Sequence, residues 1–112
     1  MPIVNTYYTS DEHKNTLTAK VQELKEYFAE VLTCGDISLK ANEITMRLIS
    51  TSSDGMIAPL ETEIFAHAFK ERVDRQDEIC LEIRKHLMQL LPTLSDVRVW
   101  LVLSELGHSW GS

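Results

Sequence analysis

The sequence PIVNTYYTSDE at residues 2–12 decides the fold of the first half of the chain. β-Branched and aromatic residues without a helical period fill residues 2–9, and this pattern predicts a first strand. Thr9 and Glu12 have the T-x-x-E spacing of a capping box, which predicts that a helix begins directly after the strand. Its apolar stripe follows spacings of three and four: Leu17, Val21, Leu24, Phe28, Val31 and Leu32. Gly35 suits the left-handed residue that ends many helices, so we expect the helix to stop there.

The same order of elements recurs in the second half. A second strand is predicted over residues 43–50, a turn-rich link over residues 50–59 and a third strand over residues 62–69. Asp74 can cap a second helix that stops at Pro92, and a fourth strand follows over residues 96–104. Two βαβ units predict an α/β chain (an α+β sandwich) whose four-stranded sheet has two helices on one face. No stretch of the 112 residues has the composition of a linker, so residues 1–112 are expected to form a single domain.

Alternation along the strands indicates which side chains share a face. In the second strand Ile44, Met46 and Leu48 fall on one face, and Thr45, Arg47 and Ile49 fall on the other. The last strand, DVRVWLVLS, is apolar on both faces, with Val97, Val99, Leu101 and Leu103 opposite Trp100 and Val102. We therefore expect this strand to be central in the sheet and covered on both sides. Because two helices cover only one face, the other face is expected to lie against further copies of the chain.

Composition limits the classes of partner. The chain has 17 acidic residues against 11 Lys and Arg, a formal charge of -6, which argues against nucleic acid. An anionic small substrate stays open, because a few arginines create a local positive field. The N-terminus lacks a signal-peptide pattern, and no window approaches about 18 apolar residues, so we expect a cytoplasmic protein without a membrane segment. Cys34 and Cys80 are expected to be reduced, buried thiols.

The standard catalytic and metal-binding motifs are missing from the sequence. There is no Gly-rich phosphate loop, H-E-x-x-H, C-x-x-C or G-x-S-x-G, so none of these motifs assigns a function. The four histidines are scattered along the chain. We interpret His67 and His86 as hydrogen-bonded or surface residues, and spacing identifies no partner for His13 and His108. Candidate chemistry therefore falls on Pro2. A small second residue permits removal of Met1, which would leave a secondary amine at the start of a strand.

The amine of Pro2 is suited to proton transfer near neutral pH. An α-amino group has a pKa of about 7.7 to 8.0 in water, and desolvation or a nearby cation lowers it. Such an amine can take a proton from oxygen or carbon. If Met1 is retained, the same nitrogen is an amide without a basic lone pair. The alternative is that Pro2 only begins a strand where its missing N–H does no harm.

The opening PIV and the stretch TSDEHKNTL at residues 9–17 resemble the N-terminus of the 4-oxalocrotonate tautomerase group, where a strand led by an amino-terminal proline runs into a helix. The chain length, the two βαβ units and the pieces MRLIS, SDG and IFAHAF more closely resemble 5-carboxymethyl-2-hydroxymuconate isomerase of the same superfamily. The likeness covers most of the chain. Apart from the proline, its motifs are short.

The resemblance implies a homotrimer with active sites at subunit boundaries. It implies a 1,3-proton shift on a dicarboxylic 2-hydroxydienoate from the catabolism of aromatic compounds, without a metal or an organic cofactor. In this reaction the proline moves the proton and arginines bind the carboxylates. Arg47, in MRLIS, falls on a family arginine of the second strand. A second family arginine corresponds to Arg72 or Arg75, with Arg72 slightly preferred. Thr9 stands where the 4-oxalocrotonate enzyme has another arginine, so identical substrate binding is not implied.

Two other functions compete with the isomerase. The first is a ferredoxin-like βαββαβ module, which binds a small ligand or has a regulatory role. It has the same order of elements with another arrangement of strands. A superfamily member that keeps the fold without isomerase activity is the other alternative. For Arg47, Arg72 and Arg75 the competing interpretation is ordinary surface charge. Four aromatic residues are expected to pack in the core or at an interface rather than to line the site: Tyr7, Tyr8, Phe65 and Trp100.

Overall fold

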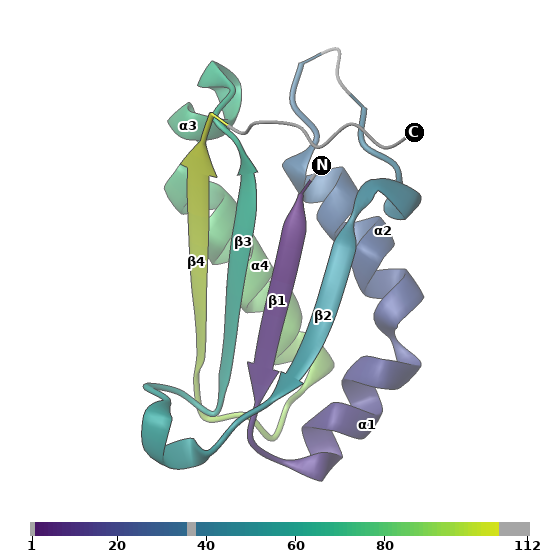
Figure 1. Cartoon of the computed structure of the whole chain (residues 1–112), viewed down its shortest axis with the longest axis vertical. Helices are drawn as coiled ribbons and strands as arrows, with labels where there is room; N and C mark the ends of the chain where they lie inside the picture. The colour runs from purple at the N-terminus through teal and green to yellow at the C-terminus, as the bar shows by residue number, and fades with distance from the viewer. Residues whose placement is uncertain (1, 36–37, 106–112) are drawn as a thin grey trace.

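The computed structural model describes residues 2–35 and 38–105. Its strands and helices follow one another as β1 (Ile3–Tyr8), α1 (Asp11–Ala19), α2 (Val21–Leu32), β2 (Thr45–Ser50), β3 (Leu60–His67), α3 (Lys70–Asp74), α4 (Gln76–Leu90) and β4 (Val97–Ser104). Single 3₁₀ turns lie at Ala41–Glu43 and Ser53–Gly55. The strands form one sheet with the helices behind it, on one face (Figure 1).

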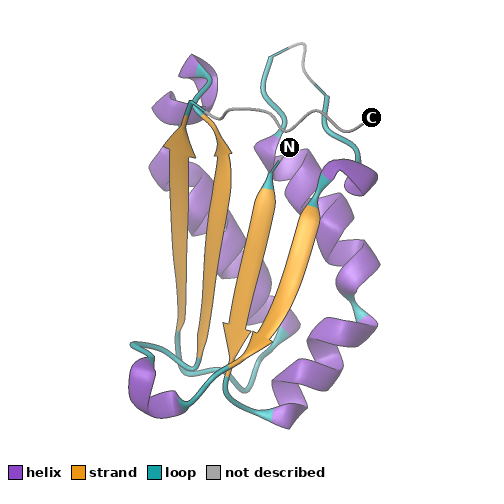
Figure 2. Ribbon diagram, viewed as in Figure 1, coloured by secondary structure: helices purple, strands orange, loops and turns teal. Residues whose placement is uncertain are grey.

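The strand order of the sheet is β2-β1-β3-β4. β1 pairs with β2 and β3 pairs with β4 in parallel, whereas the central pair β1 and β3 is antiparallel. Each βαβ unit thus places its two strands side by side, and the two units join through β1 and β3. This confirms the predicted architecture of two βαβ units with helices on one face (Figure 2). It also differs from the ferredoxin-like fold, in which the βαβ units are split by another strand.

The prediction that the last strand is central is wrong, because β4 lies at the edge of the sheet. The antiparallel pairing of β1 with β3 puts the strand that begins each unit in the middle and the strand that ends it outside. The predicted alternation is confirmed. Val97 and Leu101 are buried under the helices, whereas Trp100 and Val102 are 42% and 43% exposed on the opposite face. That face, which carries no helix, is called the open face below.

The core lies between the sheet and the helices. The sheet contributes Val4, Tyr8, Ile44, Leu60, Ile64, Val97 and Leu101, and the helices contribute Leu17, Leu24, Phe28, Leu32, Ile79, Ile83 and Leu87. The helical members recur at spacings of three and four, so one stripe of each helix is buried against the sheet.

Helix boundaries differ in detail from those predicted. The first helix is capped by Ser10 rather than Thr9, since the Ser10 hydroxyl accepts the N–H of His13 at 3.3 Å. It breaks at Lys20 into α1 and α2. Gly35 has a φ of 58°, as expected for a left-handed residue, and follows the helix by a short segment.

The second helical segment also breaks in two. Asp74 does not cap it but ends α3 and pairs with Lys70 at 2.8 Å, and α4 begins after Arg75 without a side-chain cap. The third strand covers residues 60–67, two residues earlier than predicted. Its buried residues are the even-numbered ones, so the odd-numbered residues point to the open face.

Candidate functional site

β1 begins at the end of the sheet where β3 finishes (Figure 1), and Pro2 is the residue directly before β1. The residue is buried, and its carbonyl oxygen accepts the N–H of Thr45 at 3.1 Å, which ties it to β2. Side chains alternate between the two faces along β1, and the even-numbered residues Val4 and Thr6 are buried under the helices. Pro2 is two residues before Val4 and therefore belongs to the same, helix-covered side of the sheet. Burial of this kind disfavours a charged nitrogen.

Arg47 lies on the open face, as alternation predicted. It is the register partner of Asn5 in β1, and its Nη1 donates to Asn5 Oδ1 at 3.3 Å. The Asn5 Nδ2 in turn donates to Glu63 Oε1 of β3 at 3.2 Å, and the same oxygen accepts the hydroxyl of Tyr7 at 2.5 Å. The hydrogen bond to Glu63 raises the pKa of Tyr7. A polar row therefore crosses the middle of the open face.

Two members of this row, Asn5 and Glu63, are residues that the sequence analysis missed. Both alternate onto the same face as Arg47, which was the available signal. The pairing register decides that they meet, and a single sequence does not give it.

Within one chain, Pro2 and Arg47 are on opposite faces of the sheet. Pro2 is buried on the helix side, whereas Arg47 is exposed on the open face beside Asn5, three residues further along β1. A single chain therefore does not bring the amine and this guanidinium together around one substrate.

Arg72 is buried, with 3% of its surface exposed, and its donors are engaged by the backbone. Nε and Nη2 both donate to the carbonyl of Leu32 at the end of α2, at 3.1 and 2.5 Å. Nη1 donates to the carbonyl of His67 at the end of β3 at 2.8 Å. The guanidinium also lies 5.2 Å from the ring centre of Phe69, and burial lowers its pKa. Arg72 thus ties α2 to β3.

Arg75 lies between α3 and α4, on the helix side of the molecule. Its Nε pairs with Glu78 at 3.4 Å, and it lines a pocket of about 230 Å³ beside Tyr27, Glu30 and Glu82. Neither Arg47 nor Pro2 lines this pocket.

The described histidines are held by neighbours. His13 is buried between the hydroxyls of Ser10 at 2.9 Å and Thr93 at 3.3 Å. His86 stacks on Tyr27 with ring centres 3.7 Å apart, and His67 meets the ring of Phe69 edge-on. His108 lies outside the described residues. No group of three or more His, Cys, Asp or Glu within residues 2–35 and 38–105 is arranged to hold a metal ion.

Solved structures of other proteins match nearly the whole chain. FG41 malonate semialdehyde decarboxylase, inhibited by 3-bromopropiolate, is 17% identical with a TM-score of 0.68, over 98% of this chain and 91% of its own. The W0 fused 4-OT, a wild-type symmetric trimer, is 17% identical with a TM-score of 0.65, over 92% and 87%. A macrophage migration inhibitory factor homologue from Prochlorococcus marinus is 14% identical with a TM-score of 0.56, over 97% and 95%.

At these identities the likeness establishes the fold, and the chain has the tautomerase-like fold. No protein-family model matches the chain, and no curated protein does. Among the described residues, none of the helices has the length and apolar character that crossing a membrane would require.

Proposed function

We propose that this chain is a cofactor-independent tautomerase that converts a small unsaturated 2-hydroxy acid, preferably a dicarboxylate, into its 2-oxo isomer. The observation that supports it most is the buried position of Pro2 at the head of β1 in a tautomerase-like fold. With Met1 removed, burial favours the neutral, basic form of the Pro2 amine at neutral pH.

In the proposed reaction Pro2 acts as base and then as acid. Its nitrogen takes the proton of the 2-hydroxyl group, and the electrons of that O–H bond form the ketone. The electrons of the carbon–carbon double bond then take the proton back from the same nitrogen, and a new C–H bond forms. One proton leaves oxygen and one arrives at carbon, so the isomerisation needs no oxidant or reductant.

Arg47 is proposed to bind a substrate carboxylate, and it does so from a neighbouring subunit. Because Pro2 and Arg47 face opposite sides of the sheet in one chain, a shared site needs a second copy. A guanidinium suits this task because it binds a carboxylate through two parallel hydrogen bonds.

A homotrimer would supply these neighbours. The exposed Trp100 and Val102 on the open face favour burial against another copy, and fused 4-OT structures with this fold are trimers.

Of the two arginines in the second helical region, Arg75 is the one we propose as a further carboxylate ligand. It is partly exposed and has one ion pair, whereas the donors of Arg72 are committed to backbone carbonyls. Arg72 is proposed to position the elements around the Pro2 end of the sheet.

The proposal is tested by following the ketonisation of 2-hydroxymuconate or phenylenolpyruvate in the ultraviolet. Protein that begins at Pro2 is expected to accelerate ketonisation of at least one of them, the dicarboxylate more strongly. No turnover of either substrate by correctly processed, folded protein would favour a binding module or a member of this fold without isomerase activity.

A further inference from the structure

The pairing register of the sheet contains an approximate two-fold axis. Thr6 of β1 and Thr62 of β3 are directly opposite each other, and their buried hydroxyl groups lie 3.2 Å apart. A half-turn about this pair exchanges β1 with β3 and β2 with β4. Residues at equal steps from the two threonines are therefore counterparts.

This axis relates Arg47 to Arg98. One step before each threonine lie Asn5 in β1 and Glu61 in β3. Asn5 pairs with Arg47 of β2, and Glu61 pairs with Arg98 of β4. Both arginines are exposed on the open face, each on an edge strand.

The same axis relates Pro2 to Ala58. Each lies four residues before its threonine, and each is buried. The nitrogen of Ala58 is a peptide amide whose N–H points to Glu61 Oε2 at 3.5 Å, beside the stronger bond from the N–H of Ile57 at 2.8 Å. At the second end of the sheet, Arg98 is therefore the counterpart of Arg47, and the amide nitrogen of Ala58 is the counterpart of the Pro2 amine.

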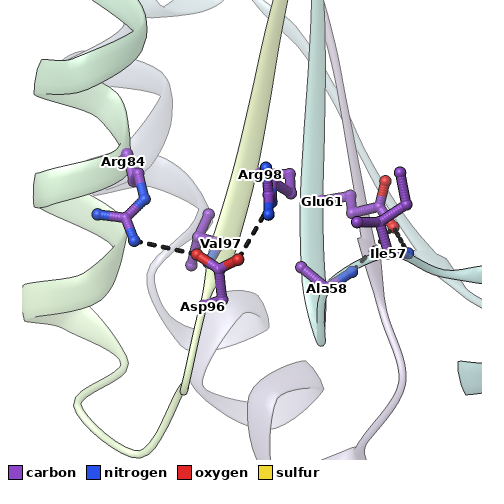
Figure 3. A network of polar contacts seen from close by, with 7 residues as sticks. All are labelled: Ile57, Ala58, Glu61, Arg84, Asp96, Val97 and Arg98. Carbon is purple, nitrogen blue, oxygen red and sulfur yellow. Dashed lines mark hydrogen bonds and ion pairs between the residues drawn. The ribbon is translucent and has the colours of Figure 1, made fainter.

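Arg98 belongs to a charged cluster at this second end (Figure 3). The carboxylate of Asp96 accepts three hydrogen bonds, from Arg84 Nη2 at 3.0 Å, from Arg98 Nε at 3.1 Å and from the N–H of Val97 at 2.9 Å. One carboxylate thus faces two guanidinium groups. Arg98 meets Asp96 through Nε, and within residues 2–35 and 38–105 its outer nitrogens, Nη1 and Nη2, donate no hydrogen bond.

A pocket of about 520 Å³ lies beside this cluster, between α4 and the outer edge of β4. Arg84, Asp96 and Arg98 line it together with the half-buried Cys80 and Val99. Pockets for small organic ligands have volumes of about 300 to 1,000 Å³.

We propose that this end of the sheet is a second binding site, in which the outer nitrogens of Arg98 hold the carboxylate of a small organic acid and Arg84 adds positive charge. Asp96 orients the two guanidiniums. The site binds without catalysing proton transfer, because Ala58 offers no amine. The inference rests on the register and the charged cluster and does not depend on turnover at Pro2.

The test titrates fumarate into the full chain at low ionic strength and follows the guanidinium resonances of Arg98 and of Arg84 by NMR, because the Arg84 signal also reports binding in a variant that lacks Arg98. A saturable shift is expected, and Arg98→Gln should weaken this binding by about tenfold or more, since a charge-assisted contact is lost. Arg47→Gln is the matched control at the counterpart position and should leave the Arg98 response in place.

A second variant separates binding from a purely structural role. Asp96→Asn removes the competing negative charge and should tighten fumarate binding at Arg98, whereas a structural ion pair would show only a loss of stability. A missing Arg98 response in folded protein, or equal fumarate affinity of the parent chain and Arg98→Gln, would overturn the proposal. Because the titration uses no turnover, it reports on this site even if ketonisation fails.

Discussion

The guanidinium of Arg72 donates two hydrogen bonds to the carbonyl oxygen of Leu32, the last residue of α2. With its third bond, to the carbonyl of His67, it connects the first βαβ unit to the end of β3. The arginine therefore acts inside the protein, at the end of the sheet where Pro2 lies.

The contacts of Arg72 predict a large effect on stability. Arg72→Ala leaves the buried carbonyl oxygen of Leu32 without this donor and takes one of two donors from the carbonyl of His67, which keeps the N–H of Phe69. It should lower the free energy of unfolding by about 3 kcal/mol, measured by urea denaturation. Arg75→Ala, which removes an exposed ion pair, is the control and should cost about 1 kcal/mol or less. An Arg72→Ala variant of unchanged stability with only a raised KM would instead make Arg72 a substrate ligand.

Arg47 is predicted to affect substrate binding. Arg47→Ala should raise KM for a dicarboxylate by about tenfold or more and lower kcat as well, because a bidentate, charge-assisted contact is lost. Arg47→Lys should restore part of the loss, since lysine keeps the charge without the planar fork. Lys85→Ala, an exposed residue of α4, is the control for a general change of charge. Kinetics of Arg47→Ala that match this control would leave Arg47 with a structural role.

The open face is predicted to be a subunit interface. Trp100→Lys should dissociate the trimer into monomers, because it places a charge in the buried contact, and light scattering measures the mass in solution. Leu81→Lys is the matched control, since Leu81 is more exposed but lies on α4, on the helix side. A parent chain that is monomeric at micromolar concentration contradicts this prediction directly.

The amine of Pro2 is predicted to set the pH dependence. Burial disfavours the protonated amine, so the pKa is expected below the usual 7.7 to 8.0 of an α-amino group. The neutral amine is the base, and kcat/KM should therefore rise with pH through this pKa and then level off. Pro2→Ala keeps a primary amine in the same place and should retain part of the activity. A pH profile that is flat across this range would remove the amine from the mechanism.

The spacing of apolar residues and the alternation along the strands predicted the order of elements and the face of Arg47, because these depend on neighbours in sequence. The two capping residues, Thr9 and Asp74, were predicted wrongly. The edge position of β4 could not be predicted, since an apolar strand has the same pattern whether another strand or another subunit covers it. Arg72 is one of three adjacent charged residues, Lys70, Glu71 and Arg72, and only the tertiary position of Leu32 decides which is buried. The link between Asn5 and Glu63 depends likewise on the register of β1 with β3.

The central claim is that the amine of Pro2 transfers the proton. It is tested most directly by comparing ketonisation rates of two preparations whose N-termini are verified by intact mass, one that begins at Pro2 and one that retains Met1. The account predicts turnover by the first and a rate at the uncatalysed level for the second, because an amide nitrogen has no basic lone pair. Equal rates from the two preparations would contradict it.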